Sequence, residues 1–175
     1  GMALKAVASS DADKVHADWP GVKVMSTPGD LLDDPDIDLV VIATPNDTHF
    51  PLAKAALEAG KHVVVDKPFT VTLSQARELE SLAKHCGRIL SVFHNRRWDS
   101  DFLTVSALIN EGQLGEVCYF ESHFDRFRPQ VRQRWREQAG PGSGIWYDLA
   151  PHLLDQVVVL FGLPVSITVD LAQLR

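Results

Sequence analysis

The segment from Leu39 to Phe69, LVVIATPNDTHFPLAKAALEAGKHVVVDKPF, decides the fold of this chain. Its first residues, Leu39–Ala43, form a continuous apolar run that is typical of a strand buried on both faces. A helical pattern follows and stops at Gly60, and a second apolar strand, Val63–Val65, comes next. A strand, a helix and a strand within about thirty residues predict one βαβ crossover of a parallel sheet.

Each strand of this crossover ends in a polar turn, Thr44-Pro45-Asn46 after the first and Asp66-Lys67-Pro68 after the second. Open α/β sheets bind their ligands at this carboxyl edge. Asn46 or Asp47 is expected to cap the helix by accepting a free backbone N–H. Lys67, held at the edge before a proline, suits proton transfer, and a solvated lysine at a strand end is the alternative.

Strands and helices alternate on both sides of the crossover. The pattern predicts strands at residues 4–8, 22–25 and 89–93, helices at 11–18, 28–33 and 101–110, and a helix capped by Thr72 or Ser74 that stops at Gly87. Beyond Gly115, residues 117–127 and 165–171 alternate as strands with one wet face, around a long apolar helix at 145–161. We expect an α/β fold with a partial dinucleotide-binding domain over residues 3–113 and the N-terminal part of an α+β substrate and oligomerisation domain over residues 114–175.

A dinucleotide-binding unit normally opens with a strand, the motif G-x-G-x-x-G and a helix. This sequence contains no such motif, so we expect a Rossmann-type parallel sheet that lacks its first βα unit. The second unit shows only two strands, too few for a stable sheet, which predicts a chain clipped at both ends. The absent strand is the central one, so the sheet should contain a gap with two unpaired inner edges. We expect association through these edges or an unusual placement of the first strands, and weak dinucleotide binding unless another chain supplies the absent segment.

The composition is that of an ordinary soluble globular protein: 175 residues, 45% hydrophobic and 23% charged. The net charge of −6 argues against a nucleic-acid-binding protein. The two cysteines, Cys86 and Cys118, lie far apart without metal-ligand spacing, which fits buried thiols in a reducing cytoplasm. No signal peptide and no membrane-spanning apolar run is found, so a cytoplasmic location without a membrane partner is expected.

Asp148 and His152 lie four residues apart on the predicted helix and therefore share a face. An aspartate beside a histidine can orient the ring and raise its basicity, as in acid–base sites. The same pair could provide two ligands of a metal, or stabilise the helix only. Asp155 lies three residues further on the same side, and Pro151 predicts an irregular first turn.

Two arginine-containing segments are candidates for binding. One of Arg96 and Arg97, which follow a predicted buried strand, is expected to face the cleft, and the other to be solvated. The second segment is an irregular loop with Phe127, Trp135 and five arginines: Arg126, Arg128, Arg132, Arg134 and Arg136. A solvated or subunit-contacting loop, a substrate-side role and single-stranded nucleic-acid binding are its three interpretations, and the acidic total weakens the last.

Three groups of residues resemble the Gfo/Idh/MocA oxidoreductases, nicotinamide-dependent dehydrogenases that act mostly on sugars and cyclitols. These groups are Ala43–Asn46 with His49, the run Ala59–Val63 leading to Asp66-Lys67-Pro68, and Asp148 with His152. Family members usually carry Glu-Lys-Pro where this chain has Asp-Lys-Pro, a change that keeps the charge. Two further runs, HNRRWD at 94–99 and GIWYDL at 144–149, resemble the branch with NADP-dependent scyllo-inositol dehydrogenases. The resemblance covers essentially the whole chain.

The resemblance implies a role for each matching residue. Lys67 would be the catalytic lysine near the reacting hydroxyl, and Asp148 with His152 would form the acid–base pair, His152 taking the hydroxyl proton. Arg96 and Asp155 would hold substrate hydroxyls. The residues that would line the cofactor are Thr44, Pro45, Asn46 and His49, with Asp66 near the nicotinamide ribose.

The choice of cofactor depends on the end of the first strand, where Ser9 and Ser10 precede Asp11 and Lys14. An acid directly at such a strand end normally binds the ribose hydroxyls of NAD. Two hydroxyls and a lysine can receive a 2′-phosphate, so we expect NADP, with NAD as the alternative. The expected protein is a homo-oligomer without a metal that binds a small polyol or sugar. A non-catalytic interaction protein that keeps the fold is the competing interpretation.

Overall fold

The computed structural model describes residues 1–125, 127, 129–130 and 138–172. Its strands are β1 (Ala6–Ala8), β2 (Lys23–Met25), β3 (Leu39–Ile42), β4 (His62–Asp66) and β5 (Leu90–Phe93). Its helices are α1 (Ala12–Asp18), α2 (Pro28–Leu32), α3 (Asn46–Glu58), α4 (Leu73–Cys86), the 3-10 helix η1 (Asn95–Trp98), α5 (Ser100–Asn110) and α6 (Gly144–Phe161). This confirms the predicted α/β fold, and β3–α3–β4 is the predicted parallel crossover, with Val40 paired to Val63 and Ile42 to Val65.

Helix boundaries follow the local chemistry of the sequence at most positions. Thr72 caps α4 in a reciprocal capping box with Gln75, and Gly87 ends that helix in the left-handed region at φ 62°. Gly60 follows α3 at φ 73°, as predicted. The prediction that Asn46 or Asp47 caps α3 is wrong, because the helix begins one residue earlier, with Pro45 at the capping position. The Asn46 amide is then part of the helix and is used in a contact with a distant loop.

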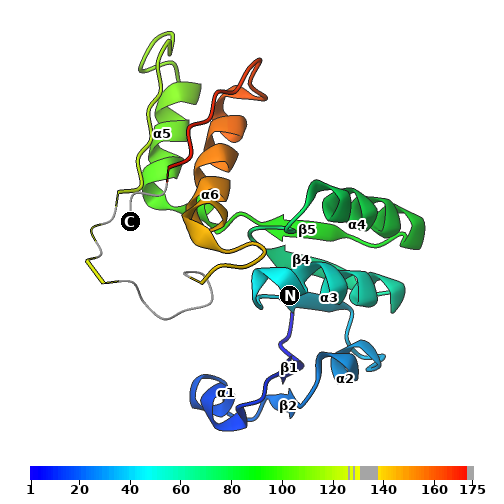
Figure 1. Cartoon of the computed structure of the whole chain (residues 1–175). Coiled ribbons are helices and arrows are strands. Elements are labelled where there is room, and N and C mark those ends of the chain that lie inside the picture. The colour runs from blue at the N-terminus through cyan, green and yellow to red at the C-terminus, as the bar shows by residue number, and fades with distance from the viewer. Residues whose placement is uncertain (126, 128, 131–137, 173–175) are drawn as a thin grey trace.

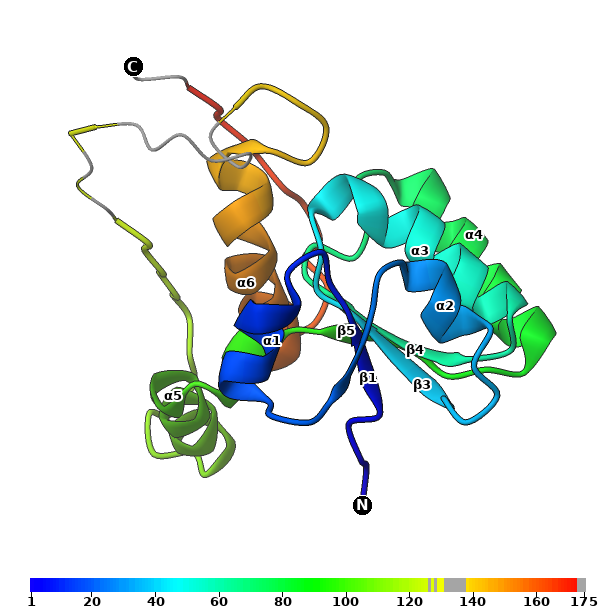
Figure 2. The ribbon, with the colours of Figure 1, turned by 90° about the horizontal axis from the view of Figure 1, so that it is seen from below.

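The core lies between the three-stranded sheet and helices α3 and α4, which cover the same face of it (Figure 2). Its fully buried members include Leu57 of α3, Leu79 of α4, and Val63 and Val65 of β4. A buried valine or leucine contributes about 1.5–3 kcal/mol relative to an exposed one, so this layer holds the crossover together.

The prediction that these strands are buried on both faces is wrong. Val41 is 64% exposed and Phe93 is 50% exposed, while Ile42 and Leu90 of the same two strands pack against the helix side. Both α3 and α4 pack on that one side, and residues of alternate parity along the strands face the other. An apolar run cannot by itself reveal whether its second face is covered.

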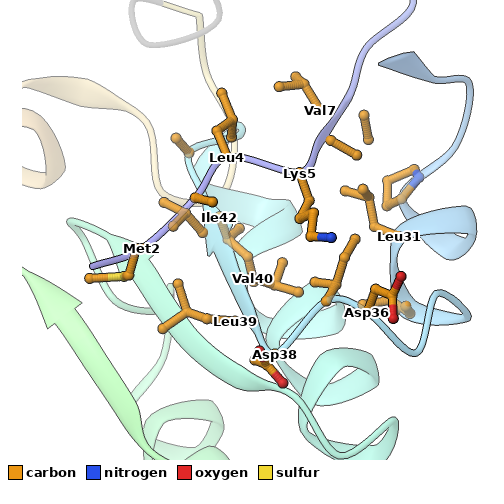
Figure 3. Close-up of a pocket in the computed structure, with 18 of the residues that line it drawn as sticks. Met2, Leu4, Lys5, Val7, Leu31, Asp36, Asp38, Leu39, Val40 and Ile42 are labelled. Atoms are coloured by element: carbon orange, nitrogen blue, oxygen red, sulfur yellow. The ribbon is translucent and has the colours of Figure 1, made fainter. Parts of the chain in front are cut away.

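The parallel strands form two separate sheets, β1–β2 and β3–β4–β5 (Figure 1). A cavity of about 840 Å³ separates β1 from β3, with Met2, Leu4 and Val7 on one wall and Leu39 and Val40 on the other (Figure 3). Within the part of the chain that the structure describes, β1 and β3 have no strand partner on the sides that line this cavity, so the expected gap with two unpaired inner edges is present.

The two strands predicted for residues 114–175 are absent from the described part of the chain. Described residues of the segments 117–127 and 165–171 form no strand, although both alternate in the expected way. A strand needs a backbone partner, and neither segment pairs within the part of the chain that the structure describes. Phe120 instead packs edge-on against Phe161 at the end of α6, with ring centroids 5.4 Å apart. All five arginines of the predicted binding loop, Arg126, Arg128, Arg132, Arg134 and Arg136, lie outside the described residues.

Candidate active site

A contact between Lys67 and Asp148 joins the sheet edge to α6. The Lys67 ammonium donates to the backbone oxygen of Asp148 at 2.7 Å and to its Oδ1 at 3.2 Å. The Lys67 side chain is only 11% exposed, because it follows β4 directly and is covered by the first turns of α6. Residues 81 positions apart in sequence are thus brought together at the carboxyl end of a parallel strand.

His152 lies one turn beyond Asp148 and is 5% exposed. Burial, together with the positive charges of Lys67 and Arg96, lowers the pKa of His152 from 6.5 to about 4, against the opposing effect of Asp148. Its Nδ1 is buried without a hydrogen-bond partner in the part of the chain that the structure describes. At neutral pH this ring is uncharged, and a neutral imidazole can accept a proton.

The two arginines after β5 have other partners than expected. Arg97 donates from Nε and Nη2 to the two carboxylate oxygens of Asp155, at 2.7 and 2.6 Å, although it was expected to be either solvated or in the cleft. Arg96 donates from Nη1 to Asp99 at 2.8 Å, stacks over Phe124, and has a buried Nε without a described partner. Asp155 therefore fixes α6 to the end of β5, and Arg96 is the arginine that lies near His152.

Together the ion pairs Lys67–Asp148, Arg96–Asp99 and Arg97–Asp155 balance their charges within the site. In each of these three pairs the carboxylate has a cation within hydrogen-bond distance, and His152 adds no charge at neutral pH. The three pairs therefore add no net charge to the described part of the site.

The turn residues of the crossover are held together by His49. Its ring is 1% exposed, with Nδ1 2.8 Å from the backbone oxygen of Pro68 and Nε2 2.9 Å from that of Thr44. This side chain bridges the turn after β3 and the turn after β4, which fixes the two turns relative to each other. Thr44 also bonds through its hydroxyl to Thr48 at 2.6 Å.

The remaining predicted cofactor residues lie at three places. Asp66 accepts from the backbone N–H of Lys67 at 2.8 Å, at the end of β4. Asn46 donates from Nδ2 to the backbone oxygen of Gly142 at 2.6 Å. Ser9 and Ser10 lie in the turn after β1, where the Ser9 hydroxyl accepts from the Asp11 N–H, so they belong to the two-stranded sheet and not to the sheet that carries Lys67.

Sequence reasoning missed three residues of this site. His94 lies 3.6 Å from the Asp155 carboxylate, Tyr147 donates its hydroxyl to the backbone oxygen of Val71 at 3.1 Å, and Gly142 packs on Asn46. His94 directly follows a strand, which was a usable signal. The other two contacts join residues more than 70 positions apart, and no local pattern indicates them.

The described residues contain no group of three histidine, cysteine, aspartate or glutamate side chains that could hold a metal ion. No described helix is both long and apolar enough to cross a membrane.

Family models match almost the whole chain. Residues 1–94 match the NAD-binding Rossmann fold of the Gfo/Idh/MocA oxidoreductase family, and residues 106–175 match the C-terminal alpha/beta domain of the same family. The chain belongs to the Gfo/Idh/MocA oxidoreductase family. The resemblance to this family is thereby confirmed.

Relatives within the family are similar over nearly all of this chain. The uncharacterized oxidoreductase YdgJ of Escherichia coli K12 is 78% identical over 175 residues, covering 100% of this chain and 51% of YdgJ. The scyllo-inositol 2-dehydrogenase (NADP(+)) IolW of Bacillus subtilis is 39% identical, covering 98% of this chain and 48% of IolW. The chain thus spans about half the length of the curated relatives it matches.

Solved structures show the same arrangement. The Yersinia pestis protein YPO2259 superposes with a TM-score of 0.93 at 67% identity, covering 100% of this chain and 49% of that one. A Synechocystis biliverdin reductase, solved with biliverdin and NADP+, superposes with a TM-score of 0.75 at 32% identity, covering 89% of this chain and 48% of that one. A nicotinamide-binding fold is therefore shared by proteins whose substrates differ widely.

Proposed function

We propose that this chain provides the acid–base group of an NADP-dependent dehydrogenase that transfers a hydride between the nicotinamide and a hydroxyl carbon of a neutral sugar or cyclitol. The observation that carries this proposal is the Lys67–Asp148 contact beside the uncharged His152, at the carboxyl end of β4. A lysine, a carboxylate and a buried imidazole at a ligand-binding edge are the groups that alcohol oxidation requires for its proton.

Each residue of the group has a part in moving that proton. His152 accepts the hydroxyl proton, because burial keeps its ring neutral. Lys67 donates a hydrogen bond to the substrate oxygen and stabilises the negative charge that develops there. Asp148 holds the Lys67 ammonium in place and favours the protonated form of His152 once the proton has moved. When bound, the nicotinamide supplies the hydride acceptor.

The residues at the two turns fit the nicotinamide side of such a site. Thr44, Pro45, Asn46 and Asp66 lie at the ends of the adjacent strands β3 and β4. The buried His49 ring lies within hydrogen-bond distance of a backbone oxygen in each turn and contributes by shaping them. We propose that Ser9 and Ser10, with the exposed Lys14, receive the 2′-phosphate, which favours NADP over NAD. IolW is named as an NADP(+)-dependent enzyme, which agrees with this choice.

The balanced charges of the site support a neutral polyol as the substrate. Arg96 and Asp155 are proposed to contact its hydroxyls, Arg96 through the buried Nε near His152 and Asp155 from its ion pair with Arg97. The name of IolW points to scyllo-inositol as a first compound to assay. Because one relative is a biliverdin reductase, a linear tetrapyrrole should be assayed beside the polyols.

Three further properties belong to the proposal. We place the boundary between the two domains at residues 113–114, within the turn that follows α5. The expectation that both cysteines are buried is wrong, because Cys86 is half-buried and Cys118 is exposed. As free thiols they still support a reducing cytoplasmic location. The unpaired edges of β1 and β3 support a homo-oligomer that associates through them, and a strictly monomeric sedimentation profile at all concentrations would refute that association.

The same open edges favour a second candidate, a non-catalytic protein that uses the fold for interaction alone. Calorimetric titration with NADP and NAD, followed by turnover assays with scyllo-inositol and myo-inositol, separates the two functions. A dehydrogenase binds NADP more tightly than NAD and loses turnover in Lys67→Met. An interaction protein shows neither binding nor turnover, and Lys67→Met changes nothing that these assays measure.

A further inference from the structure

The N-terminal end of α6 and the loop before it dock on the Rossmann part of the chain through residues that take no part in the proposed proton transfer. We propose that Asn46, Gly142 and Tyr147 form a clamp of positioning residues, which holds the first turn of α6 so that Asp148 reaches Lys67. The role given to this clamp rests on the proposed function, but the contacts that form it involve neither cofactor nor substrate.

The Asn46 side chain contacts the loop before α6 and does not face solvent. Asn46 is buried, and its Nδ2 donates to the backbone oxygen of Gly142 at 2.6 Å across 96 positions of sequence. A buried amide donor must be satisfied, and this one is satisfied by the loop. Its part in the site is therefore to hold the loop before α6 on the first turn of α3.

Gly142 allows the loop to come this close. Its φ of 73° lies in the left-handed region, and a Cβ there would lie 3.0 Å from Cγ2 of Val71 and 3.1 Å from Cβ of Asn46. A side chain there would have to push both neighbours away by a few tenths of an ångström, and the positive φ would add strain to it. The loop backbone thus packs directly on the two residues that flank the turns after β3 and β4.

Tyr147 fixes the other side of the same turn. Its hydroxyl donates to the backbone oxygen of Val71 at 3.1 Å, so Val71 is contacted by both Gly142 and Tyr147. Asp148 is the next residue along, and its backbone oxygen is the nearest acceptor of the Lys67 ammonium. A rotation of this turn would move that backbone oxygen together with the Asp148 carboxylate, so the clamp controls both contacts of Lys67.

The test replaces single clamp groups and measures the ionisation of His152 by NMR titration of its ring. Gly142→Ala adds the clashing Cβ, and Gly21→Ala is its control, because Gly21 has φ 86° with nothing within 4 Å of an added Cβ. Tyr147→Phe removes one hydroxyl, and Tyr119→Phe, at an exposed tyrosine, is the matched control.

We expect Gly142→Ala and Tyr147→Phe to raise the pKa of His152 from about 4 towards 6.5, by about one unit, because a loosened α6 admits water and reduces the burial that lowers it. Both controls should leave the pKa unchanged. The clamp is refuted if Tyr147→Phe and a folded Gly142→Ala titrate as the native chain does, or if all four variants shift alike, which would indicate general loosening.

The proposed function is tested separately with the same proteins. If the native chain binds neither NADP nor NAD, the dehydrogenase proposal fails while the titration of His152 still decides the clamp. If the native chain turns over, Tyr147→Phe should lower kcat by roughly tenfold with a smaller change in KM, because a misplaced Lys67–Asp148 pair affects the reacting state more than binding. An unchanged kcat in that variant would also overturn the clamp.

Discussion

Replacing His49 by leucine should weaken the fold more than any exposed histidine substitution. The His49 ring is fully buried, and its two nitrogens lie 2.8 and 2.9 Å from the backbone oxygens of Pro68 and Thr44. Which nitrogen carries the proton depends on the tautomer, so at least one buried hydrogen bond is lost. A buried carbonyl left without its donor costs about 1–3 kcal/mol, and the poorer fit of leucine adds about 1 kcal/mol.

The expected loss for His49→Leu is therefore about 2–4 kcal/mol, out of the roughly 5–15 kcal/mol that such a domain has in total. Urea unfolding measures it as a lower midpoint at an unchanged slope. His85→Leu, on the exposed side of α4, is the control and should stay within about 0.5 kcal/mol of the native chain. A loss below about 1 kcal/mol for His49→Leu would show that the ring does not hold the two turns together.

Three other perturbations test separate parts of the structure. Leu57→Ala in the core should lower the free energy of unfolding in urea by about 2–5 kcal/mol. Leu73→Ala, at an exposed position, should lower it by under about 1 kcal/mol, and equal losses would contradict the core described above. His152 has a lower pKa in the native than in the unfolded chain, so the unfolded chain binds more protons below about pH 6.5. The free energy of unfolding should therefore fall by about 1–2 kcal/mol, after allowance for solvent screening, as the pH drops from about 6.5 to 4. His152→Asn should lack this part of the pH dependence, and an identical profile would contradict it. Arg97→Ala removes both donors of the largely buried Asp155 and should cost about 1–3 kcal/mol, with partial recovery in Arg97→Lys; no loss would show that the pair does not fasten α6.

Local chemistry was sufficient to predict the first half of the fold. The crossover from Leu39 to Asp66, the Thr72 cap and the glycine stops at Gly60 and Gly87 all follow from side-chain periodicity and backbone preferences within a few residues. The gap between β1 and β3 was also predictable, because the strand order of a doubly wound sheet shows which neighbour the sequence does not provide.

Properties that depend on distant partners could not be predicted in the same way. Alternation at residues 165–171 indicates which side chains would share a face, but a strand forms only where another backbone pairs with it. The exposure of Val41 depends on which face α3 and α4 cover. Arg97 is bound by Asp155 across 58 positions, and local sequence could not distinguish it from Arg96.

The candidate site was likewise predictable in its local parts and not in its distant contacts. The Asp148–His152 spacing on one helix and the position of Lys67 at a strand end were visible in the sequence. Their meeting was not, because it depends on Gly142 and Tyr147 docking α6 against Val71. Family resemblance supplied the expectation that these residues act together, and the 2.7 Å contact of Lys67 with Asp148 is the physical observation that supports it.

The measurement that tests this site most directly is an NMR titration of the His152 ring in the native chain and in Lys67→Met, which removes the ammonium and keeps the length of the side chain. We predict a pKa of about 4 in the native chain and a higher pKa in Lys67→Met, because a positive charge beside the ring is lost. Lys54→Met, at an ammonium that pairs with Glu78 on the helix surface, should leave the titration unchanged. A native His152 that titrates near 6.5, or one that does not respond to Lys67→Met, would contradict a buried acid–base group formed by Lys67, Asp148 and His152.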